Sequence, residues 1–131
     1  MKYYESVKQR QYVVEVHIAD IHFGSIDPLK QFNILNEQFL SKIATIDFDI
    51  LSIDGDIFDK KFMANSMAVM YAMEFVRICT ELCKAKQATM IIISGGKKKI
   101  TGALALAVLH GSMMRTERCI ICTCFPKNSR I

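Results

Sequence analysis

Carboxylate and histidine side chains follow two apolar segments of this chain, at the points where strands are predicted to end. Asp20 and His22 come directly after residues 12–19, with Ile21 between them. On an extended backbone alternate side chains point to the same side, so Asp20 and His22 are expected to share one ion. A carboxylate with an imidazole suits Mn, Fe or Zn better than Mg or Ca. Taken alone, the pair is better explained by an aspartate that caps a turn beside an ordinary loop histidine.

A second group of carboxylates strengthens the metal hypothesis. The segment "SIDGDIFD" carries Asp54, Asp56 and Asp59, and Gly55 allows the backbone to turn sharply beside Asp56. Several carboxylates at one strand end repel one another unless a cation or a basic group offsets them. The alternative is solvated loop charge, with Asp59 near a helix start where the helix dipole favours it. That alternative fits Asp59 and also Asp54, but fits Asp56 less well.

The elements that would position these residues alternate between strand and helix. Apolar, β-branched runs predict strands at residues 12–19, about 49–53 and 88–95. Helices are expected from Pro28, with Asp27 as the capping residue, and over about residues 63–86. This order predicts an α/β protein with a mostly parallel sheet (βαβαβ) flanked by helices, joined by right-handed crossovers. Ligands bind at the carboxyl ends of such strands, so the loops at 20–22, 54–59 and 94 are expected to meet at one edge.

Each predicted helix has an apolar stripe, and the methionines of the second stripe are expected to fill the core. The third strand is apolar throughout, which is typical of a sheet covered on both faces. The stripe of the first helix is Leu29, Phe32, Leu35, Phe39 and Ile43. The stripe of the second is Met63, Met67, Met70, Phe75, Cys79 and Leu82.

Length and composition indicate one folded domain. The 131 residues suffice for one core, and 51% hydrophobic with 23% charged residues argue against disorder or a fibrous repeat. No stretch is apolar for long enough to span a bilayer and no secretory signal is visible, so a cytoplasmic protein without a membrane partner is expected. The five cysteines are then expected to be reduced.

The charge and the sequence patterns change near residue 96. Residues 1–94 carry a net charge of −2 and residues 95–131 a net charge of +6. We therefore divide the chain into residues 1–96 and a divergent basic, cysteine-containing tail, residues 97–131, with a short helix expected at 102–109 and a strand at 119–124. Lys97, Lys98 and Lys99 are candidates for contact with phosphate or nucleic acid, although a short charge run is more often solvated surface. Cys119, Cys122 and Cys124 resemble a fragment of a thiolate metal site, but buried or incidental cysteines explain them better.

The two motifs in order resemble the opening of the calcineurin-like metallophosphoesterases. "HIADIHFG" and "GDIFDKK" look most like the SbcD-type nuclease subunits of DNA repair and recombination complexes, including phage relatives. The resemblance covers about residues 13–95, which would form the N-terminal part of the metallophosphoesterase domain. It implies a two-metal site, usually manganese, in which Asp20 and His22 hold the first ion and Asp56 bridges both. His17 is expected to support the site and Asp59 to be structural. The implied partners are DNA and the ATPase subunit that accompanies such nucleases.

The sequence departs from this family after the third strand. Where the family supplies a histidine motif for the second metal and for protonating the leaving group, this chain has "SGGKKKI", and His110 is the only later histidine. We therefore name no catalytic residue and expect impaired hydrolysis. One hypothesis is that the coding sequence after Gly96 continues out of register with the ancestral enzyme, which the other reading frames of the DNA would test.

Two functions remain open from the sequence. The first is a manganese-dependent phosphodiesterase or nuclease acting on DNA, reduced by the missing motifs. The second is a non-catalytic binding protein that keeps this half-fold and acts on a nuclease, its ATPase partner or nucleic acid. A partial sheet would expose apolar surface, so oligomers or partners are expected.

Overall fold

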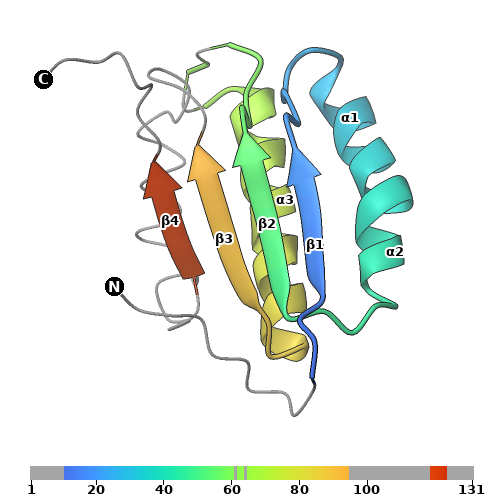
Figure 1. The fold of residues 1–131 in the computed structure, drawn as a ribbon. Helices are drawn as coiled ribbons and strands as arrows, with labels where there is room; N and C mark the ends of the chain where they lie inside the picture. The colour runs from blue at the N-terminus through green and yellow to red at the C-terminus, as the bar shows by residue number, and fades with distance from the viewer. Residues whose placement is uncertain (1–10, 61, 64, 95–118, 124–131) are drawn as a thin grey trace, which may run out of the picture.

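The computed structural model describes residues 11–60, 62, 63, 65–94 and 119–123. Four parallel strands form one sheet in the order β1-β2-β3-β4 (Figure 1). The strands are β1 (Glu15–Ala19), β2 (Ile50–Gly55), β3 (Thr89–Ser94) and β4 (Cys119–Thr123). The predicted α/β class with a parallel sheet is confirmed, and so is the strand expected in the basic tail. The helix expected at 102–109 lies outside the described residues.

The two longest helices begin directly after residues whose side chains cap their free N–H groups. The Asp27 carboxylate accepts from the Lys30 N–H at 3.0 Å, and Pro28 opens α1 (Pro28–Leu35), as predicted. The chain continues through the π-helical turn η1 (Asn36–Leu40) into α2 (Ser41–Ile43). The Ser66 hydroxyl accepts from the Val69 N–H at 3.3 Å, so α3 (Met67–Ala85) begins at Met67 rather than at Met63.

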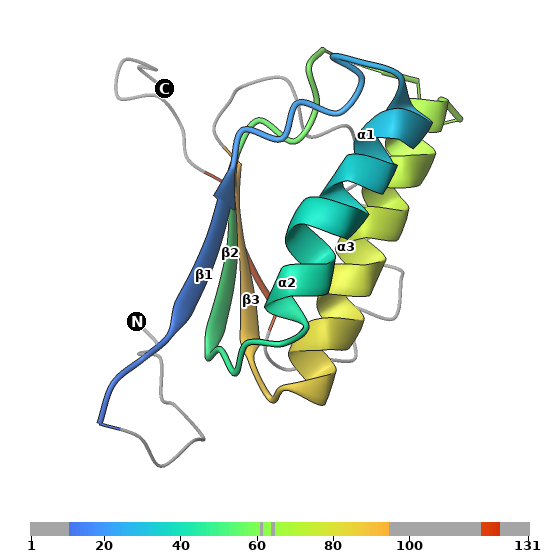
Figure 2. The same ribbon diagram turned by 90° about the vertical axis from the view of Figure 1, so that its right-hand side faces the viewer.

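The core lies between the sheet and the helices, and the described helices all lie on one face of the sheet (Figure 2). Phe75 of α3 is fully buried, with its ring centroid 5.9 Å from that of Phe23 and 6.1 Å from that of Phe39. Side chains alternate along the strands, so the opposite face of the sheet carries polar residues such as His17 and Asp54. The apolar third strand predicted a sheet covered on both faces, but within the described part of the chain no helix covers this opposite face.

The two predicted helix stripes are only partly correct. Leu29 is 47% exposed, and Met63, Met67 and Met70 are 76%, 52% and 55% exposed, so the prediction that these methionines fill the core is wrong. The reason is a different phase for α3. Its buried face consists of Ala68, Val69, Ala72, Phe75, Val76, Cys79, Thr80 and Cys83. Met67 and Met70 lie outside this buried face, and Met63 precedes the helix.

Candidate functional site

The loops that follow β1 and β2 run side by side beyond the sheet. The Asp20 N–H donates to the Asp54 carbonyl at 3.0 Å, and the His22 N–H donates to the Asp56 carbonyl at 3.1 Å. Phe23 continues the pairing with a parallel bridge to Phe58. These backbone bonds bring the two predicted motifs to the same edge of the sheet. β3 also ends at this edge, because Ser94 is in register with Gly55.

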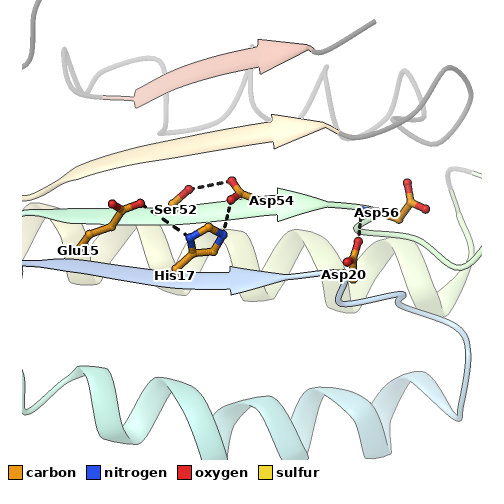
Figure 3. A network of polar contacts seen from close by, with 6 residues as sticks. All are labelled: Glu15, His17, Asp20, Ser52, Asp54 and Asp56. Carbon is orange, nitrogen blue, oxygen red and sulfur yellow. Dashed lines mark hydrogen bonds and ion pairs between the residues drawn. The ribbon is translucent and has the colours of Figure 1, made fainter. Parts of the chain in front are cut away.

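Asp20 and Asp56 meet through a side-chain to backbone contact. The Asp20 Oδ1 accepts a hydrogen bond from the Asp56 N–H at 3.2 Å (Figure 3). Gly55 has φ 74°, and a Cβ atom built there would overlap Asp20 Oδ1. Two features therefore require glycine at position 55: the left-handed backbone, and the close approach of the Asp20 carboxylate.

His22 lies in the same edge loop with an unusual environment. Its Nδ1 atom is buried and has no hydrogen-bond partner. Leaving a buried polar atom unpaired costs about 1–3 kcal/mol, and such atoms in native proteins are commonly explained by a bound ion, by water or by function. This ring nitrogen is thus an observation that favours a ligand at the loop.

The geometric reason for pairing Asp20 with His22 does not hold. The prediction assumed an extended backbone, on which alternate side chains share a side, whereas both residues have φ 52°. Among the residues that the structure describes, no three His, Cys, Asp or Glu side chains come together as a metal-binding group. Asp20 and His22 lie at one edge because their backbone N–H groups pair with the loop after β2, and not because side chains alternate along an extended strand.

Asp54 belongs to a different cluster from Asp56. Its Oδ2 forms an ion pair with His17 Nε2, its Oδ1 accepts from the Ser52 hydroxyl at 2.7 Å, and Glu15 Oε1 lies 3.9 Å from His17 Nδ1 (Figure 3). This network lies on the sheet face away from the described helices. The interpretation of Asp54 as a solvated loop charge is wrong, because its carboxylate is paired with the histidine of the neighbouring strand.

Gln31 is a buried residue of the site that the sequence analysis did not single out. It is 7% exposed, and its side chain reaches from α1 to the loop between Ile21 and Gly24. The signal was present in the sequence, since Gln31 lies four residues before Leu35 of the predicted apolar stripe and therefore on the same face of the helix. A glutamine at that point of an amphipathic helix faces protein and needs hydrogen-bond partners there.

Three ionisable groups of the described chain, Glu74, Arg77 and Cys79, have shifted pKa values, and all three lie on α3. Burial, together with the nearby Cys83, raises the pKa of the Cys79 thiol well above its ordinary range, so the thiol stays protonated and unreactive. The hydrogen bond from Arg77 lowers the pKa of Glu74 on the exposed side of α3.

Of the remaining residues that the sequence singled out, Asp59 is described by the structure, whereas the three lysines and Cys124 are not. Asp59 is exposed, and its backbone N–H donates to the Phe23 carbonyl at 3.0 Å, which agrees with a structural role. Lys97, Lys98, Lys99 and Cys124 lie outside the described residues. Contact of the three lysines with nucleic acid stays a prediction.

Comparison with known proteins assigns no family to this arrangement. The sequence matches no family model and no curated protein. Among the described helices, none is long and apolar enough to cross a membrane. Fold and site therefore define an α/β protein with a candidate site at the carboxyl edge of a parallel sheet.

Proposed function

We propose that this chain is a metallophosphoesterase of the SbcD nuclease type that hydrolyses phosphodiester bonds in DNA with reduced activity. The observation that carries the proposal is the contact between Asp20 and the Asp56 backbone across Gly55. It brings the first motif directly against the second, at the sheet edge where open α/β folds bind ligands. Such a junction requires Gly55, so the glycine of the motif has a physical role in the site.

Asp20, His22 and Asp56 are the residues that would hold metal ions. Carboxylate oxygens with an imidazole nitrogen suit Mn²⁺, and the unpartnered Nδ1 of His22 agrees with a ligand at this loop. Bound metal lowers the pKa of a coordinated water and stabilises the charge that develops on a phosphate. Three candidate ligands favour weak binding of one ion over a complete two-metal site. No histidine is available directly after β3 to protonate a leaving group, which favours slow turnover.

The proposal is tested by phosphodiester hydrolysis and by metal content. Purified protein is loaded with Mn²⁺ and assayed on bis-p-nitrophenyl phosphate and on single-stranded DNA. We expect a low rate that falls to background in Asp20→Ala and in Asp56→Ala. Asp59→Asn is the matched control, because it removes an exposed carboxylate from the same loop, and it should keep the rate and the bound manganese. Equal rates in wild-type protein and both alanine variants would exclude metal-dependent catalysis by these residues.

A second candidate function is a non-catalytic interaction protein, and the exposed methionines of α3 favour it. Met67 and Met70 are more than half exposed on the outer side of the helix, where adaptable apolar side chains can pack against another protein. Here we expect a stable complex with a nuclease or its ATPase subunit that survives Asp56→Ala and is lost in Met67→Lys with Met70→Lys. A protein that stays monomeric and captures neither partner would contradict this function.

A further inference from the structure

One buried side-chain amide holds the peptide groups on both sides of His22. Gln31 Nε2 donates to the Ile21 carbonyl at 2.8 Å and to the His22 carbonyl at 3.1 Å, and Gln31 Oε1 accepts from the Gly24 N–H at 3.0 Å. The two carbonyls belong to the peptide groups that precede and follow the Cα atom of His22. Their orientations define φ and ψ of His22, so this amide fixes the direction of its Cα–Cβ bond.

The loop needs such a clamp because its backbone is left-handed at alternate residues. Asp20 and His22 have φ 52°, and Gly24 has φ 94°. A residue with a side chain persists in this conformation only where its surroundings hold it there. The His22 N–H is held by the Asp56 carbonyl and the Ile21 carbonyl by Gln31. The His22 carbonyl accepts both from Gln31 and from the Ser25 N–H, which lies 3.0 Å away.

The contacts also select the residue type. Two carbonyls and one N–H face the side chain of Gln31, so the group there must donate twice and accept once, which a carboxamide does. A carboxylate would accept from Gly24 but would place its second oxygen against the two carbonyls. Asparagine is shorter by one methylene group and would not reach from α1.

We propose that Gln31 is the positioning residue for His22, and that its amide aims the imidazole for metal binding at the sheet edge. This inference rests on the proposed function, because it assigns His22 to a metal site. Gln31 itself touches neither metal nor substrate in this role. It acts through the backbone of its neighbour, as residues behind a metal ligand commonly do.

The test compares Gln31→Leu and Gln31→Glu with the matched control Gln38→Leu. Gln38 is an exposed glutamine of the same helical segment, and its Oε1 accepts only a long 3.4 Å bond from Lys42. Two signals are followed by nuclear magnetic resonance: amide hydrogen exchange at Gly24 in metal-free protein, and broadening of the His22 imidazole signals during titration with MnCl₂. Neither signal depends on hydrolysis.

In Gln31→Leu we expect faster exchange at Gly24 and a Mn²⁺ affinity at His22 that is lower by about tenfold or more. Gln31→Glu should keep slow exchange at Gly24, because an acceptor remains, and still lose affinity, because both donors are gone. Gln38→Leu should match the wild-type protein in both signals. If Gln31→Leu does not fold, Gln31→Glu decides the question.

Two outcomes would overturn the inference, and they are distinguishable. Wild-type affinity in the folded Gln31 variants would refute the positioning role and leave the proposed metal site intact. Wild-type protein whose His22 signals do not broaden with Mn²⁺ would refute the metal site, and the positioning role with it.

Discussion

The substitution Gly55→Ala tests the contact at the centre of the site most directly. Gly55 has φ 74°, and an added Cβ would overlap the Asp20 carboxylate that accepts from the Asp56 N–H. The new methyl group must therefore displace this carboxylate, so we expect the substitution to break the junction between the two loops.

The magnitude follows from three contributions. A left-handed backbone at alanine costs about 1–2 kcal/mol. A hydrogen bond to a charged acceptor contributes about 1.5–3 kcal/mol, and the low end applies to Asp20 because this bond is exposed and 3.2 Å long. Replacing glycine by alanine restricts the unfolded chain, which offsets about 0.4–1 kcal/mol. We expect Gly55→Ala to lower the free energy of unfolding by about 2 kcal/mol.

A double-mutant cycle separates two costs of Gly55→Ala: the overlap of the new methyl group with the Asp20 carboxylate, and the left-handed backbone at alanine. In an Asp20→Ala background the carboxylate is absent, so Gly55→Ala should cost only the backbone contribution. The double variant should therefore be less destabilised than the sum of the single variants by about 1.5 kcal/mol, the value of the shared hydrogen bond. Urea unfolding followed by far-UV circular dichroism measures this, with equal m-values as the check on two-state behaviour. Additive losses within about 0.5 kcal/mol would refute the contact.

Three further predictions concern the core and its ionisable groups. Phe75→Ala should destabilise the protein by about 3–5 kcal/mol, because the ring is fully buried, whereas Met70→Ala should change stability by less than about 0.5 kcal/mol, which parallel urea titrations compare. Asp49→Ala leaves the Val14 N–H without the Oδ2 acceptor now 2.8 Å away and should cost about 1–3 kcal/mol, so wild-type stability in this variant would argue against the bond. Cys79 has its pKa raised by burial above the ordinary 9.0, so the unfolded thiol loses its proton first and stability should fall above pH 9.0 by up to about 1.4 kcal/mol per pH unit. Cys79→Ala should flatten that part of the pH curve, and an unchanged slope would refute the assignment.

The strands and the first helix could be predicted because their signals are local. β-branched runs mark β1, β2 and β3, and the Asp27–Pro28 pair fixes the start of α1 without any tertiary contact. The phase of α3 could not be predicted in this way. Methionines and small residues occupy adjacent positions of that helix, and both are compatible with a core. The outcome depends on which side chains face the sheet in the folded protein, and there Ala68 and Ala72 belong to the buried face.

The sequence could not show that Asp54 and Asp56 have different partners. Asp54 and Asp56 are neighbours in one motif, yet Asp54 pairs with His17 of the adjacent strand while Asp56 meets Asp20 beyond the strand end. That division depends on the register of β1 against β2, in which Ala19 lies beside Asp54. Register is a long-range property, and spacing within one motif does not contain it.

The conformation of the edge loop after β1, in contrast, is indicated by its residue types. Left-handed backbone occurs at residues 20, 22 and 24, and the side chains there are aspartate, histidine and glycine. Glycine adopts this conformation freely, and aspartate and histidine adopt it more readily than most other residues. The motif D-x-H-x-G is therefore a conformational pattern as well as a set of ligands. In this loop the carbonyls of Ile21 and His22 point toward α1, where the buried side-chain amide of Gln31 donates to both.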